Sequence, residues 1–126
     1  MPSARLLSWT GIALIFTIGL IHAIEAPGSF EEAAYKGWLF CANGLGALIA
    51  AAGIYQHKRR VGWSLGLLIA VGSLLGYAVS RTLGLPGIPA EPDAWFEPLG
   101  VASVLAEGMF VVVWMQAATR NSQHPS

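Results

Sequence analysis

The stretch that decides the fold is Pro98–Ala118, which reads PLGVASVLAEGMFVVVWMQAA. Apart from Glu107 and Gln116, every side chain in it is apolar or small. In a helix that rises about 1.5 Å per residue, a run of this length crosses the ~30 Å hydrocarbon core of a bilayer. A carboxylate at that depth costs roughly 2.5–3.5 kcal/mol on insertion scales, so Glu107 is the first candidate for a functional residue.

Three runs of similar length precede it, Leu6–Ile24, Gly37–Tyr55 and Val61–Ser80. The chain is 55% hydrophobic and 11% charged, with a mean hydropathy of +0.59. A soluble domain would carry about 25% charged residues, and the four runs leave no room for one. The sequence therefore predicts an all-α fold: a single membrane domain over residues 1–126, built as an integral membrane four-helix bundle with short loops.

The first and third connections between the spans contain sequence signals for ordered structure. Residues 81–98 read RTLGLPGIPAEPDAWFEP, and the four prolines predict an ordered, Pro-rich extracytoplasmic loop between helices 3 and 4 that covers the end of the bundle. In the connection between the first two spans, Glu32 follows Ser29 at the spacing of a capping box. That spacing predicts a short interfacial helix from Ser29 through Tyr35.

Basic residues are divided unequally between the two sides. Five lie on the side of the termini and the QHKRR connection (Arg5, Lys58, Arg59, Arg60 and Arg120), and two on the other side (Lys36 and Arg81). By the positive-inside rule, both termini are expected in the cytoplasm, and the lipid bilayer is the expected partner. The formal net charge of zero gives no indication of a nucleic-acid partner.

Small residues recur at every fourth position of the spans, as at Gly62, Gly66 and Ala70. This spacing lets helix backbones approach closely in lipid and predicts a tight bundle. It does not account for the polar residues of the extracytoplasmic half. His22 lies about one turn from the end of the first span, and Arg81 lies at the end of the third.

Glu97 begins the fourth span, and Glu107 lies roughly 15 Å deeper along the helix. The sequence predicts a polar cavity with His22, Arg81 and Glu107 at its core, and with Glu32 and Glu97 at its entrance. Ser73, Tyr77 or water would connect Arg81 to Glu107.

Several strings of this chain resemble a group of small bacterial four-span membrane proteins of unknown function. They are HAIEAPGSFEE (22–32), SRTLGLP (80–86), EPLG (97–100) and Glu107, and the second is the most specific. The resemblance covers most of the chain and implies a bacterial cytoplasmic (inner) membrane location. It implies the positions of interest, His22, Glu32, Arg81, Glu97 and Glu107, and implies no activity.

Four functions stay open at this stage. In the first, the cavity binds a small ligand, proton or ion, with Arg81 and His22 holding an anionic or polar ligand while Glu107 exchanges a proton. A four-span protein of this kind is expected to act as a homo-oligomer. In the second, the protein is a metal or haem redox protein, with His22, Glu25 and Glu32 as metal ligands.

A bis-histidine haem would need two chains, because His22 is the one histidine within a span. In the third, the protein is a non-catalytic accessory subunit of a larger membrane complex. The fourth is a membrane enzyme that uses Glu107 or Glu32 as general acid–base. The sequence has no nucleophile–base spacing and no recognised cofactor motif, so it names neither a reaction nor a cofactor.

Overall fold

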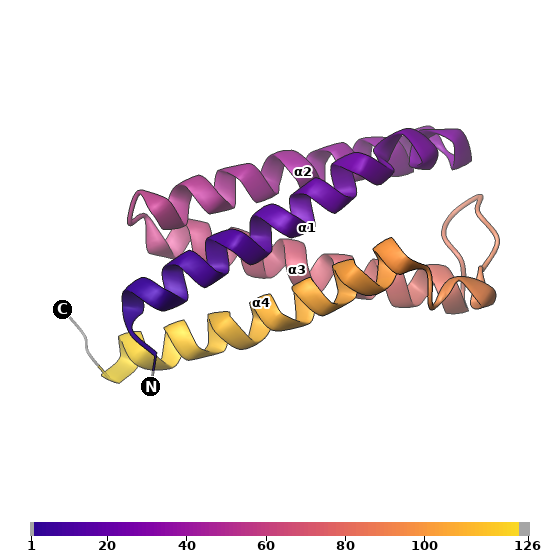
Figure 1. Cartoon of the computed structure of the whole chain (residues 1–126). Helices are drawn as coiled ribbons and strands as arrows, with labels where there is room; N and C mark the ends of the chain where they lie inside the picture. The colour runs from indigo at the N-terminus through magenta and orange to yellow at the C-terminus, as the bar shows by residue number, and fades with distance from the viewer. Residues whose placement is uncertain (1, 124–126) are drawn as a thin grey trace.

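The computed structural model describes residues 2–123, with side chains to residue 120, and consists of four long helices joined by short connections (Figure 1). They are α1 (Ala4–Glu32), α2 (Ala34–Tyr55), α3 (Arg59–Thr82) and α4 (Pro98–Gln123), with a short 3-10 helix, η1 (Pro92–Ala94), before α4. Each of the four expected spans falls inside one of these helices. The all-α four-helix fold is therefore confirmed.

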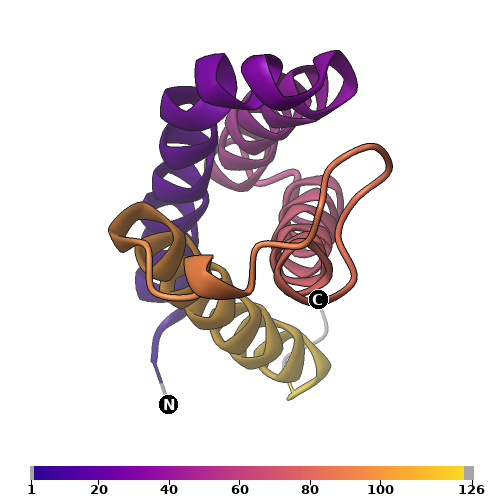
Figure 2. The same cartoon turned by 90° about the vertical axis from the view of Figure 1, so that its right-hand side faces the viewer.

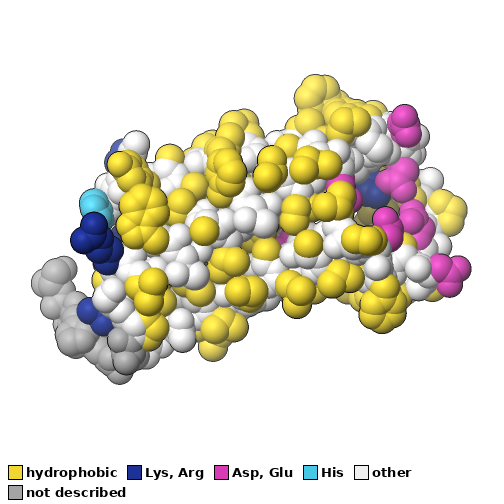
Figure 3. Space-filling model, in the orientation of Figure 1, with side chains coloured by type: hydrophobic (Ala, Val, Ile, Leu, Met, Phe, Trp, Pro, Cys, Tyr) yellow, Lys and Arg dark blue, Asp and Glu magenta, His cyan; other side chains and the backbone are white. Residues whose placement is uncertain are grey.

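All four helices are long and apolar enough to cross a membrane. On the face shown in Figure 3, hydrophobic side chains cover the middle of the molecule, with basic side chains at one end and acidic side chains at the other. Leu45, Leu68 and Leu75 of the spans are more than 60% exposed, as suits contact with lipid tails. The chain is a multi-pass membrane protein.

The two ends of the bundle are built from different segments. We call the end with the Gln56–Lys58 connection, the start of α1 and the end of α4 the polybasic end. There the Arg120 Nη1 donates a hydrogen bond to the Pro2 carbonyl oxygen at 3.2 Å. We call the other end, formed by the α1–α2 junction and residues 83–97, the acidic end; Figure 2 views the bundle from it.

The prediction of a separate short helix from Ser29 through Tyr35 is wrong. Instead, α1 runs through Pro27 as far as Glu32, and the chain breaks at the single extended residue Ala33 (φ −165°, ψ 141°) before α2 begins. The buried Ser29 hydroxyl donates to the Glu25 carbonyl oxygen at 3.0 Å and therefore caps no new helix. Membrane-spanning helices tolerate an internal proline because neighbouring groups compensate for the missing hydrogen bond.

At the polybasic end, α3 packs closely against α2 and α4. Gly62 of α3 lies against the α2 backbone, where a Cβ atom would come within 2.6 Å of the Ile54 nitrogen. Gly66 lies under the completely buried Phe110 ring of α4. The Trp63 and Phe110 rings are 5.4 Å apart between centroids and form part of the main hydrophobic core.

The α2–α3 connection contains a left-handed residue. His57 has φ 62°, the one non-glycine residue with positive φ among those the structure describes. The next amide, that of Lys58, donates to the Gly53 carbonyl oxygen at 2.8 Å. This bond closes the end of α2 in the geometry that usually places glycine at the left-handed position.

The α3–α4 connection folds back on the bundle. Leu85 and Ile88 exchange backbone hydrogen bonds in a tight turn, and Gly84 before it has φ 84°. The Tyr35 hydroxyl of α2 donates to the Pro86 carbonyl oxygen. The Glu91 amide donates to the Ser80 carbonyl oxygen at 3.0 Å, so the connection contacts both α2 and α3.

Candidate functional site

A cavity of about 890 Å³ opens between the helices at the acidic end. All four helices and the α3–α4 connection contribute to its wall. In Figure 3, acidic side chains surround a hollow at this end, and a basic side chain is visible inside it. The volume lies in the range of sites that bind small organic molecules, ~300–1,000 Å³.

The structure brings the sequence-predicted residues to this one cavity. Its wall includes His22, Glu25, Glu32, Arg81, Glu97 and Glu107. That these residues bind a ligand stays a prediction, and their individual contacts differ from the expected ones.

The deep end of the cavity is a polar cluster from three helices. Glu107 is 1% exposed, and the Ser103 hydroxyl one turn earlier in α4 donates to its Oε2 at 2.7 Å. The Asn43 Nδ2 of α2 donates to the Ser73 Oγ of α3 at 2.8 Å. Ser73 and Glu107 both line the cavity. We call Asn43, Ser73, Ser103 and Glu107 the deep cluster.

Sequence reasoning missed Asn43, which lay beside a stripe of small residues. Its Oδ1 is buried and accepts no hydrogen bond from the described residues. A buried acceptor without a donor costs about 1–3 kcal/mol, so such an atom in a cavity wall indicates a missing partner. An amide side chain in the middle of a membrane span was the signal that could have revealed it.

His22 is oriented by its own helix. Its Nδ1 lies 2.8 Å from the Ile18 carbonyl oxygen, which can only accept, so Nδ1 carries the proton and Nε2 is left for the cavity. The imidazole ring lies against the Phe40 ring, 5.0 Å between centroids.

The ligand set expected for a metal does not come together. Within residues 2–123, no group of three or more His, Cys, Asp or Glu side chains is arranged to hold a metal ion, and this includes His22, Glu25 and Glu32. Of the other two histidines, His57 lies at the polybasic end and His124 lies outside the described residues.

Arg81 is held by the α3–α4 connection. Its Nε and Nη2 each lie 3.3 Å from the Ala94 carbonyl oxygen, and its Nη1 donates to Ser80 Oγ at 2.8 Å. Its Nη2 also lies 3.4 Å from the Glu97 carboxylate, and the guanidinium group covers the Tyr77 ring at 3.7 Å. Most of its donors are occupied, so Arg81 anchors the connection and has little capacity left for an anionic ligand.

Acidic groups outnumber basic groups around the cavity. Five carboxyl groups line it (Glu25, Glu32, Glu91, Glu97 and Glu107), with two basic side chains, Lys36 and Arg81. Both basic groups already form ion pairs, Lys36 with Glu32 and Arg81 with Glu97. Partial burial, together with the neighbouring Glu32 carboxyl group, raises the pKa of Glu91.

Comparison of the chain with protein-family models, curated proteins and solved structures finds no match. The resemblance to small bacterial four-span proteins therefore stays a prediction. The function has to be inferred from the chemistry of the cavity.

Proposed function

We propose that the protein binds a small, positively charged organic molecule in this cavity, with the deep cluster as its anchor. The observation that carries the proposal is a cavity of about 890 Å³ whose wall includes the buried Glu107 carboxyl group. With both termini in the cytoplasm, the cavity opens toward the outside of a bacterial cytoplasmic membrane. The ligand class differs from the anionic ligand that Arg81 and His22 suggested.

The deep cluster offers acceptors. The Asn43 Oδ1 is buried without a donor, and Glu107 receives the Ser103 hydroxyl on only one of its two oxygens. An ammonium group supplies three N–H donors and a positive charge, which matches such a set. A carboxylate or phosphate ligand would instead meet like charge and like acceptors.

The entrance favours the same ligand class. The carboxyl groups of Glu25, Glu32 and Glu91 line the cavity, and the two basic side chains among them are already paired. A wall with excess carboxylate raises the local concentration of cations and repels anions. The Tyr35–Pro86 hydrogen bond crosses from α2 to the connection beside this entrance.

The ligand also has room for an apolar part. Ile24, Leu39 and Leu68 line the cavity, and each is more than half exposed on the surface of the helices. The wall therefore includes side chains that face lipid, and an amine with a short alkyl chain finds both polar and apolar contacts. When the cation is bound, it neutralises the Glu107 carboxylate, and when it leaves, a proton on Glu107 does so. The site inside the membrane therefore stays neutral in both states.

The test uses three probes of one size: butylammonium, butanol and butyrate. Thermal unfolding and calorimetric titration of the purified protein in mild detergent should show binding of butylammonium in preference to the other two. Glu107→Gln should weaken butylammonium binding by roughly tenfold or more, because a hydrogen bond to a charged group contributes about 1.5–3 kcal/mol. Asp93→Asn is the matched control, since it removes one negative charge at the same end from an exposed residue that does not line the cavity.

Two results would overturn the proposal. One is equal binding of butylammonium to the wild type, Glu107→Gln and His22→Ala. Neither residue would then contribute to ligand binding. The other is a preference for butyrate, which would restore the anionic ligand and the role first expected for Arg81.

A further inference from the structure

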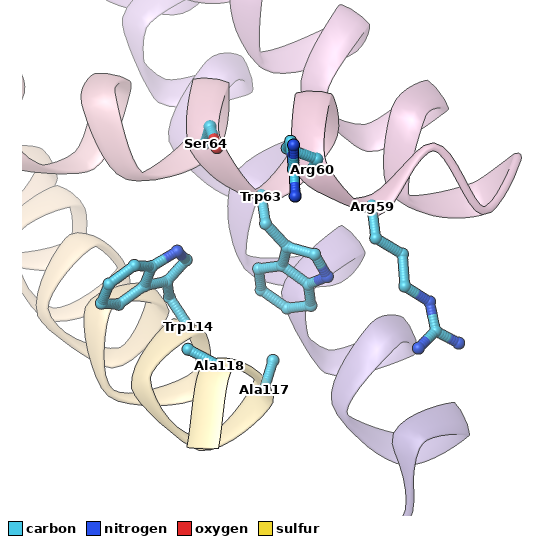
Figure 4. A pocket seen from close by; sticks show the side chains of 7 residues that line it. All are labelled: Arg59, Arg60, Trp63, Ser64, Trp114, Ala117 and Ala118. Atoms are coloured by element: carbon cyan, nitrogen blue, oxygen red, sulfur yellow. The ribbon is translucent and has the colours of Figure 1, made fainter. Parts of the chain in front are cut away.

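A second, smaller cavity lies at the polybasic end. It has a volume of about 200 Å³ and lies between the start of α3 and the end of α4. Its wall consists of Arg59, Arg60, Trp63 and Ser64 from α3 and of Trp114 with two alanines from α4 (Figure 4). It shares no residue with the cavity at the acidic end, and we call it the arginine–tryptophan groove.

The positive charge of the groove has no counterpart nearby in the chain. Residues 33–90 and 108–126 contain no Asp or Glu, and neither do residues 1–24. The two ion pairs formed by the described side chains both lie at the acidic end and involve neither Arg59 nor Arg60. Arg59 and Arg60 both line the groove, and a guanidinium group is suited to the planar, multi-donor recognition of an anion such as phosphate.

Packing fixes the tryptophan wall. The six-membered ring of Trp63 lies over Gly11 of α1, and the same indole packs against Phe110, which leaves it only 6% exposed. In Figure 4 the five-membered ring, with its Nε1, is turned to the side on which Arg59 lies. Trp114 packs against the hydrophobic core and forms the opposite wall.

We propose that the arginine–tryptophan groove binds the phosphate diester of an anionic phospholipid. Arg59 and Arg60 supply charge and donors, and the Trp63 indole N–H and the Ser64 hydroxyl add two neutral donors. A lipid is favoured over free phosphate because the groove lies at the end of membrane-spanning helices, at the level where tryptophan side chains meet headgroups. The indole faces and the alanines give the glycerol and first methylenes an apolar wall.

The test is lipid retention by the full chain in detergent, measured by native mass spectrometry with phosphatidylglycerol and phosphatidylcholine in equal amounts. The wild type should retain one phosphatidylglycerol in preference to phosphatidylcholine. Each arginine near an anionic headgroup contributes roughly a fivefold change, so the pair Arg59→Gln and Arg60→Gln should reduce retention about thirtyfold. Lys58→Gln is the matched control, because it removes one positive charge from the residue directly before Arg59, and Lys58 does not line the groove.

Helix content and elution volume of each variant show whether it is folded. Arg60→Gln alone changes an exposed side chain, so it provides the readout, a loss of roughly fivefold, if the double variant fails to fold. Equal retention of the two lipids, or an equal loss in Lys58→Gln and Arg60→Gln, would overturn a specific headgroup site. Displacement of the lipid by inorganic phosphate at the same concentration would overturn the lipid as its occupant.

Discussion

The two ends of this bundle use the same kinds of residue for opposite purposes. At the polybasic end, a Cβ atom on Gly62 would lie 2.6 Å from the Ile54 nitrogen, so glycine there allows the α2 and α3 backbones to touch. At the acidic end, a Cβ atom on Gly72 or Gly76 would meet nothing within 4 Å, and both residues line the large cavity. Small residues in membrane helices thus permit contact in one place and leave space in another.

The arginines differ in the same way. Arg81 at the acidic end is surrounded by acceptors from Ser80, Ala94 and Glu97, and it holds a connection in place. Arg59 and Arg60 at the polybasic end line a groove in a part of the chain without acidic residues. A charge that is paired within the protein supports the fold, and a charge without such a partner can bind something else.

The largest effect is expected for Gly62→Ala. The added methyl group would press on the α2 backbone, which cannot move aside as a flexible side chain can, so the free energy of unfolding should fall by roughly 1–3 kcal/mol. Gly72→Ala is the same change in open space and should leave that free energy unchanged or raise it by up to about 1 kcal/mol. Denaturant titration in detergent, followed by helix content, measures both, and equal effects would remove the contrast between the two ends.

The next effect concerns binding. Gly76→Leu places an isobutyl group into the cavity and should reduce butylammonium binding by roughly tenfold or more without unfolding the bundle, because the ligand loses its space. Gly108 also has open space beside it but does not line the cavity. The control variant Gly108→Leu should therefore bind butylammonium as the wild type does. Unchanged binding in Gly76→Leu would show that the ligand does not enter this part of the cavity.

A smaller gain is expected at the polybasic end. His57→Gly should raise the free energy of unfolding by about 1 kcal/mol, since glycine adopts the left-handed conformation of this position (φ 62°) without steric cost. Thermal unfolding would detect it, with exposed Gln56→Gly as the control, because Gln56 has an ordinary φ of −84°. Destabilisation by both substitutions would show that the left-handed geometry costs little here.

The smallest effect is a pH dependence at the acidic end. Because the pKa of Glu91 is raised in the folded protein, the stability that this group contributes is fully present below its ordinary pKa of 4.5 and is lost as the pH rises through the raised pKa. The charged groups facing Glu91 are Glu32, Lys36 and Arg81. The protection factor of the Glu91 amide, which donates to Ser80, should therefore decrease with rising pH.

Glu91→Gln cannot ionise and should remove this dependence. Asp93→Asn, in the same connection, should retain it. A pH profile that is the same in the wild type and in Glu91→Gln would assign the effect to another group.

Much of the fold could be predicted from the sequence because it depends on single runs of residues. Four apolar runs of sufficient length required four helices, and the positions of Lys, Arg, Asp and Glu separated the polybasic end from the acidic end. The burial of Glu107 was also predicted, since a carboxyl group in the middle of such a run lies at the depth of the hydrocarbon core.

The errors arose where two segments compete for one polar group. Ser29 matched a capping box by spacing, but its hydroxyl is satisfied by the Glu25 carbonyl oxygen inside a continuous helix. Arg81 seemed free for a ligand, but the Ala94 carbonyl oxygen occupies two of its nitrogens. Asn43 was overlooked because its partner, Ser73, lies 30 positions away on another helix.

The sequence by itself determined that this chain crosses a membrane four times and carries a carboxyl group at depth, because hydropathy and length act locally along the chain. Only the tertiary structure decided which glycines touch a neighbouring helix and which border a cavity, and which arginine is paired. The physical reason is that close packing and hydrogen bonding depend on distances between helices, and the local pattern of one helix does not encode those distances.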